Sequence, residues 1–288
     1  MRIGFQLPYS GNLKKLETRI RVSRGNAFQV YARSKRGIDG EGNPYPLHEL
    51  SDKNVNMFKS LTNSIYPAIV HAPLSHNLAQ KERKNKQGEQ WSQVECLIEE
   101  LAFCQRLGCD YYVLNAGHSK TLERDEAIQN IRMHIEEALG KSDFEGNVLI
   151  RNAAGAGTEL AADLEEWSRL VSWNPRVKGA LDLGRAYAYG HSFFDEKETA
   201  AFIKELDDVV GFDHIKMVYI NDSKRGRGAQ KESPTILGEG FIHFSGYECI
   251  LEHPVLQALP WMLEHHPVKL PDLYDRSLEF LKDRRGRV

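Results

Sequence analysis

The chain has little of what marks a secreted, membrane or disulfide-stabilised protein. Its four cysteines in 288 residues are too few and too scattered for a disulfide framework, and we interpret Cys104 and Cys109 as core thiols. No run approaches the roughly 20 apolar residues that a membrane span requires. The start of the chain enters a strand-like run at Ile3 without a signal peptide. These absences predict an intracellular protein of the reducing cytoplasm, with no membrane partner.

The chain also lacks a strong charge of either sign. Its 38 Lys and Arg residues against 40 Asp and Glu residues give a formal charge of -2, so no global positive field indicates a nucleic-acid partner. Local basic patches remain possible. With 41% hydrophobic and 27% charged residues, the composition is typical of a globular protein. No Gly/Ser or charge-rich linker divides the chain, which predicts a single domain over residues 1–288.

Eight short apolar runs alternate with amphipathic stretches along the whole chain. The predicted strands are Ile3–Leu7, Ala27–Tyr31, Ala68–His71, Tyr111–Asn115, Val148–Arg151, Val177–Asp182, Ile215–Ile220 and Trp261–Glu264. The predicted helices are Leu13–Val22, Gln93–Leu107, Asp125–Leu139, Thr158–Val171, Lys197–Val210 and Asp272–Lys282. Eight βα units of about 36 residues predict a closed (β/α)8 TIM barrel, and a doubly wound open sheet is the alternative.

Six of these runs end in, or close to, a polar side chain. In a parallel barrel the strand ends converge on one cavity, so their agreement favours a site over a set of separate loop contacts. The six residues are His71, Asn115, Arg151, Asp182, Tyr219 and Glu264.

Two loops that follow predicted strands are rich in basic residues. The segment 34–48, after the second strand, contains Lys35 and Arg36, and the segment 221–228, after the seventh, contains Lys224, Arg225 and Arg227. Such loops are either solvated or bind phosphates. The small residues of 152–158, after the fifth strand, would also let backbone N–H groups approach an anion.

Seven segments together resemble the endonuclease IV family of zinc-dependent apurinic/apyrimidinic endonucleases. They are IVHAPLSHNL (69–78), LNAGH (114–118), RNAAGAGT (151–158), ALDLGRAYAYG (180–190), YINDSK (219–224), LGEG (237–240) and LPWMLE (259–264), and they occur in family order from first strand to last. The resemblance implies a TIM barrel that acts on abasic sites in DNA through a three-zinc cluster with nine His, Asp and Glu ligands.

The resemblance also shows where the ligand set departs from the family. His71, Asp182 and Glu264 stand at family ligand positions, and Glu232 stands where the family has Asp. The other five positions are changed: Asn115 and Tyr219 replace His, Arg151 replaces the bridging carboxylate, and Arg185 and Pro234 replace two further His.

These changes predict that a trinuclear cluster cannot assemble. Arginine has no lone pair to donate and remains charged, so Arg151 and Arg185 place fixed cations where metals would lie. We expect no cofactor, or a single zinc or manganese ion held by the residual ligands His71, Asp182, Glu264 and Glu232. The two arginines could instead pair with the carboxylates, or hold a phosphate.

The resemblance carries over DNA contacts as well. Arg36 aligns with the arginine that the family inserts into the duplex, and Leu74 lies in the second intercalating segment. Arg33, Lys35 and Arg36, with the basic loop 224–227, would frame the cavity with positive charge. Oligomeric state is not predictable from these features.

Three functions remain open on the sequence alone. The first is a protein that binds abasic or nicked duplex DNA with little cleavage, using Asn115, Arg151, Arg185, Tyr219, Arg36, Lys224 and Arg225 as substrate- or phosphate-binding residues. The second is an active phosphodiesterase with His71, Asp182 and Glu264 as catalytic groups on a reduced metal site. The third is a sugar or sugar-phosphate enzyme of the xylose-isomerase-like superfamily, with the same three residues transferring protons.

Overall fold

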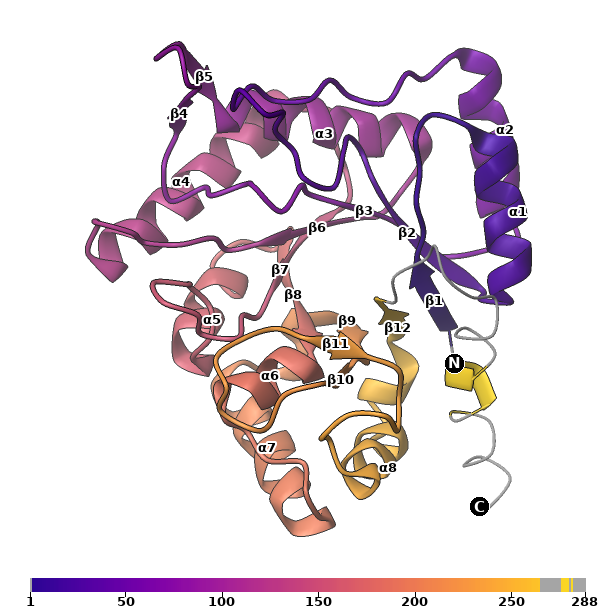
Figure 1. Ribbon diagram of the computed structural model, residues 1–288, viewed down its shortest axis with the longest axis vertical. Coiled ribbons are helices and arrows are strands. Elements are labelled where there is room, and N and C mark those ends of the chain that lie inside the picture. Colours follow the sequence, from indigo (N-terminus) through magenta and orange to yellow (C-terminus); the bar gives the residue numbers. More distant parts are fainter. Residues whose placement is uncertain (1, 265–275, 280, 282–288) are drawn as a thin grey trace.

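Eight parallel strands close into a barrel surrounded by helices in the computed structural model (Figure 1), which describes residues 2–264, 276–279 and 281. The strands pair in the order β1-β12-β9-β8-β7-β6-β3-β2, and β1 closes the ring by pairing Ile3 with Trp261 of β12. The barrel strands are β1 (Arg2–Gln6), β2 (Ala27–Tyr31), β3 (Ala68–His71), β6 (Tyr111–Asn115), β7 (Asn147–Arg151), β8 (Val177–Asp182), β9 (Ile215–Tyr219) and β12 (Pro260–Leu263). The predicted (β/α)8 barrel is therefore confirmed.

Helices follow the barrel strands. Two short hairpins lie in the loops after β3 and β9. The helices are α1 (Leu13–Ser23), α2 (Asp52–Thr62), α3 (Gln93–Leu107), α4 (Arg124–Lys141), α5 (Leu164–Val171), α6 (Leu183–Tyr189), α7 (Glu196–Val209) and α8 (Phe244–Glu252), with 3-10 turns at Phe212–His214 and Leu256–Ala258. The hairpins pair β4 (Glu82–Lys84) with β5 (Gln90–Ser92), and β10 (Asp222–Ser223) with β11 (Pro234–Thr235).

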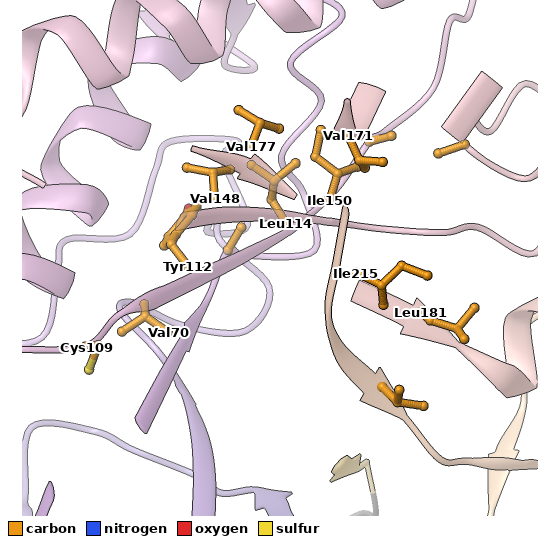
Figure 2. Close-up of a cluster of buried hydrophobic side chains, with 14 of the residues drawn as sticks. Val70, Cys109, Tyr112, Leu114, Val148, Ile150, Val171, Val177, Leu181 and Ile215 are labelled. Carbon is orange, nitrogen blue, oxygen red and sulfur yellow. The ribbon is translucent and has the colours of Figure 1, made fainter. Parts of the chain in front are cut away.

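Alternation along each strand separates two hydrophobic layers. One side chain in two points into the barrel, where Ile69, Val113 and Leu149 form a small central cluster. Their neighbours in the chain belong to the larger outer cluster, which also contains residues of the surrounding helices, and Figure 2 shows Val70, Leu114 and related side chains of this cluster. The same alternation decides which residue at the end of each strand faces the mouth of the barrel.

Helix boundaries follow local capping signals that the apolar pattern does not contain. Ser92 caps α3 by accepting a hydrogen bond from the Glu95 N–H, and Gly108 ends this helix with a left-handed conformation. The helix predicted over Thr158–Val171 begins only at Leu164, where Asp163 caps it. The preceding residues hydrogen-bond elsewhere, since Leu160 N–H donates to Gly117 O. The predicted helix Asp272–Lys282 lies largely outside the described residues, of which 276–279 and 281 are helical.

Candidate functional site

The last inward-facing residues of the eight strands meet at the carboxyl-terminal mouth of the barrel. Side chains two positions apart on a strand point to the same side, so the residues that follow the central cluster by two positions also face inward. His71, for example, follows Ile69, and Asn115 follows Val113. The residues at the mouth are Gln6, Tyr31, His71, Asn115, Arg151, Asp182, Tyr219 and Glu264. Six of these residues were predicted. Gln6 and Tyr31 were missed, although the same alternation rule applied to β1 and β2 selects both.

Arg151 is the centre of this ring. Its side chain is 1% exposed, and its Nε lies 2.8 Å from Asp182 Oδ2. Its Nη2 lies 2.6 Å from Glu264 Oε2 and 3.3 Å from Glu232 Oε1, and it also donates to Asp182 Oδ2. The guanidinium carbon lies 3.8 Å from the centroid of the Tyr219 ring. One buried cation thus joins carboxylates from two strand ends and from the loop between β10 and β11.

Arg185, in the first turn of α6, makes a second set of hydrogen bonds with the residues of the ring. Its Nη2 donates to Glu232 Oε2 at 2.7 Å, and its Nη1 donates to Asn115 Oδ1 at 2.8 Å. Its backbone N–H donates to Asp182 Oδ1, so the carboxylate that pairs with Arg151 also caps α6. Arg185 therefore holds Glu232 beside the mouth, and Asn115 orients Arg185.

Tyr219 lies beneath Arg151 and is fully buried. Its hydroxyl donates to Gln29 Oε1, and Gln29 Nε2 donates to Gln6 Oε1. The ring supplies a cation–π contact to the guanidinium from below, while the hydroxyl ends a chain of amides inside the barrel. Tyr219 thus supports Arg151 and does not line the cavity, so it can act on a ligand only through Arg151.

The electrostatics of the ring follow from this pairing. Burial acts to raise the pKa of Glu264, but the Arg151 guanidinium outweighs it and lowers this pKa to about 2. The pKa of Glu232 is lowered in the same way, by Arg185 and Arg151 against the effect of burial. Burial lowers the pKa of His71 to about 4, so its imidazole is neutral at pH near 7. Burial raises the pKa of Asp182, with Arg151 and Arg185 acting against this effect, and the two guanidinium groups and three carboxylates of the ring sum to a formal charge of -1.

The three carboxylates are close enough to share a metal ion. One oxygen from each of Asp182, Glu232 and Glu264 lies within 4.8 Å of the others. Arg151 Nη2 lies within 3.3 Å of all three side chains, which is the place that a shared ion would take. His71, the remaining predicted ligand, lies outside this group of three.

A cavity of about 1080 Å³ opens above the ring. It is lined by Gln6, Pro8, Tyr9, Ser10, Tyr31, Arg33, Ser34, Lys35, His48, Leu74, Arg151, Arg185, Lys224, Glu232, Pro234, Thr235, Ile236, Glu239 and Glu264. Among the predicted DNA contacts, Lys224 and Leu74 line it directly. Arg36 and Arg225 are exposed on the same loops as the lining residues Lys35 and Lys224.

Arg33 differs from the other predicted cations of the rim. It is buried, and its guanidinium lies 2.6 Å from Glu100 Oε1 and 3.0 Å from Glu99 Oε2. Its Nη1 donates to Tyr45 O, which fixes the loop that follows β2 to helix α3. The prediction that Arg33 adds free positive charge to the rim is therefore corrected, because two carboxylates neutralise it.

Residues 27–284 match the family of xylose isomerase-like TIM barrels. The chain belongs to that family. It is 28% identical over 293 residues to a protein of Carboxydothermus hydrogenoformans named probable endonuclease 4, in a match that covers 99% of this chain and 100% of the relative. A relative of the same name from Aquifex aeolicus is 27% identical over 91% of this chain and 90% of its own length.

Endonuclease IV from Thermus thermophilus has the same fold, with a TM-score of 0.82 at 23% identity over the full length of both chains. The endonuclease IV-like character predicted from the seven motifs is thus confirmed. No helix in the described part of the chain has the length and apolar character needed to cross a bilayer.

Replacing the buried cation tests the network. We expect Arg151→Met to lower the free energy of unfolding by about 3–5 kcal/mol, because it removes the buried partner of Asp182 and Glu264 and leaves Arg185 to balance three carboxylates. The control is Arg169→Met, whose partner Asp125 is 83% exposed and whose loss should cost about 1 kcal/mol or less. Chemical denaturation at neutral pH measures both, and equal losses would contradict the central place of Arg151.

Acid titration tests the burial of His71. The unfolded chain takes up a proton on this imidazole as the pH falls through 6.5, whereas the folded chain resists until the pH nears about 4. Folding stability should therefore fall by about 3 kcal/mol over this window through His71 alone. Denaturation curves for the natural chain and for His71→Gln should converge as the pH falls from near neutral, and parallel curves would argue against a buried neutral imidazole.

Proposed function

We propose that this protein binds duplex DNA at abasic sites or nicks through the mouth of its barrel, and that it does so without three-zinc hydrolysis of the phosphodiester. The observation that carries this proposal is the position of Arg151 Nη2 among Asp182, Glu232 and Glu264. The family resemblance indicates the substrate class, which is DNA with abasic sites. Arg151 is the residue that sets the mouth of this barrel apart from the metal site of the family.

The residues at the mouth do not fit a multinuclear zinc centre. A guanidinium that lies between the carboxylates already pairs with each of them and takes the position that a shared ion would occupy. At roughly 4 Å and an effective dielectric constant near 20, two unit charges repel by about 4 kcal/mol, and a divalent ion doubles this cost. Arg185 and Pro234 offer no donor atom to a metal. Without a metal, the site has no means of generating hydroxide from water near neutral pH.

DNA binding in this proposal depends on the rim of the cavity. Lys35 and Arg36 lie on the loop after β2, and Lys224 and Arg225 lie on the loop after β10, all four exposed. Cations on two loops beside one opening can contact the phosphates of a bent or gapped backbone, which are the main source of affinity for DNA. Arg151 and Arg185 offset two of the three carboxylate charges below, which weakens the repulsion of an anionic backbone at the rim.

The decisive experiment combines metal analysis with binding and cleavage assays. Purified protein should contain no stoichiometric zinc or manganese, and it should bind a duplex with an abasic-site analogue or a nick more tightly than the intact duplex. Cleavage of an abasic oligonucleotide should stay at background with added zinc or manganese, with and without Asp182→Asn. Metal-dependent cleavage that Asp182→Asn abolishes would establish an active reduced site instead. Equal, negligible binding to all duplexes would refute the DNA proposal.

The salt dependence of binding tests the rim. Lys224→Ala should reduce the slope of log affinity against log salt concentration by about one, as expected when one phosphate contact is lost. Lys59→Ala is the matched control, because Lys59 is an exposed lysine near the carboxyl-terminal end of α2, at the opposite end of the barrel. Fluorescence anisotropy on an abasic duplex measures both slopes. An unchanged slope for Lys224→Ala would exclude this loop as a phosphate contact.

A further inference from the structure

The cavity above the ring has two walls of different chemistry. Arg151, Arg185, Glu232 and Glu264 form a charged wall on one part of its lining. Apart from the cations Arg33 and Lys35, the residues from β1, β2 and their loops form a neutral wall that combines aromatic rings with a few polar atoms. This neutral wall consists of Gln6, Pro8, Tyr9, Ser10, Tyr31, His48 and Leu74, of which Leu74 reaches the cavity from the loop after β3.

Two phenols of the neutral wall are buried without a partner. Tyr9 is 8% exposed and Tyr31 is 6% exposed, and neither hydroxyl has a hydrogen bond within the described residues. The Nε2 atom of His48 is also buried without a hydrogen-bond partner among the described residues. A buried hydroxyl without a partner is costly, so a ligand that offers acceptors or donors there recovers this cost. Burial raises the pKa of both tyrosines, so each keeps its proton for donation.

The rings around these polar atoms favour a flat ligand. Tyr9 and His48 meet edge to face with 5.3 Å between ring centroids, and Leu74 is 48% exposed at the opening. Apolar faces beside isolated hydrogen-bonding atoms match a planar heterocycle, whose faces are apolar and whose edge is polar.

Charge orients such a ligand. The ring at the bottom has one net negative charge, because Asp182, Glu232 and Glu264 outnumber the two arginines. A phosphate is therefore disfavoured at the bottom and favoured at the rim, beside Lys35 and Lys224. The volume of about 1080 Å³ exceeds what a base-free sugar phosphate needs, since pockets of about 300–1,000 Å³ hold drug-sized ligands.

We infer that the neutral wall binds a nucleobase, so that the site takes a nucleotide with its base attached and with its phosphate at the rim. This inference builds on the proposed function in sharing its cavity, and it adds the class of ligand. It separates the site from one shaped for an abasic sugar alone.

Calorimetric titration of the full chain with single nucleotides tests the inference without a duplex. The probes are 2′-deoxyadenosine 5′-monophosphate, 2-deoxyribose 5-phosphate and inorganic phosphate. The nucleotide should bind at least about tenfold more tightly than the sugar phosphate, since base–aromatic stacking is typically worth that factor or more. Equal affinity for the nucleotide and the sugar phosphate, or no saturable binding of the nucleotide, would overturn the inference.

Phenol deletions locate the binding. Tyr9→Phe and Tyr31→Phe should each weaken nucleotide binding by roughly three- to tenfold, as expected for one lost hydrogen bond, and should leave sugar-phosphate binding unchanged. Tyr111→Phe is the matched control, because Tyr111 begins β6 at the opposite mouth of the barrel. Circular dichroism confirms that each variant is folded. If the two variants behave like Tyr111→Phe, the neutral wall does not bind the base.

The two proposals fail separately. Duplex binding with a normal salt slope but no preference for a base-bearing nucleotide leaves the proposed function standing and removes the nucleobase pocket. Nucleotide binding that depends on Tyr9 and Tyr31, without damage-selective duplex binding, leaves the nucleobase pocket standing and removes the proposed function. A third pattern, in which the sugar phosphate binds best, would instead support a sugar-phosphate enzyme and overturn the nucleobase inference.

Discussion

The buried guanidinium of Arg151 is the interaction on which the mouth of the barrel depends. Its partners come from β8, from the residue after β12 and from the loop between β10 and β11, so one side chain joins distant parts of the chain. Burying a charge is expensive unless it is paired and hydrogen-bonded, and here three carboxylates and an aromatic face surround it. The cation is therefore also a constraint, because losing Arg151 would leave the buried carboxylates of Asp182 and Glu264 without their ion-pair partner.

A metal ion and a guanidinium can both neutralise a ring of carboxylates, but they do different chemistry. A metal lowers the pKa of bound water and can accept a new ligand at an open position. A guanidinium has no lone pair, no open coordination site and a fixed plane of donors. Exchanging one for the other removes the open coordination site and the source of hydroxide, and it replaces a charge of +2 by a charge of +1. A site with the guanidinium can therefore bind a ligand without hydrolysing it, whereas a metal site performs both steps at one place.

The sequence reveals the strands because each is a short apolar run, and it reveals six of the eight mouth residues because six runs end in or close to a polar side chain. It does not reveal α2, α6 and α8 or the late start of α5, since caps and loop hydrogen bonds decide them. Tyr31 and Gln6 went unnoticed because neither is a metal-ligand type, and Gln6 lies inside the predicted run Ile3–Leu7 and not at its end. The burial of Arg33 depends on Glu100, which is far along the chain and meets it only once the barrel closes.

Lys35 and Lys224, the cations of the rim, lie on loops that are held at their bases by hydrogen bonds and ion pairs. This rigidity lowers the entropic cost of binding an extended anion. Arg33 ties the loop carrying Lys35 to α3. Asp222 accepts hydrogen bonds from the backbone N–H groups of Gly240 and Ile242, which closes the long loop carrying Lys224. Loops held in this way lose less conformational freedom on binding than free segments do. The negative ring below then keeps phosphates at the level of these loops, so a nucleotide that enters the cavity must lead with its uncharged end.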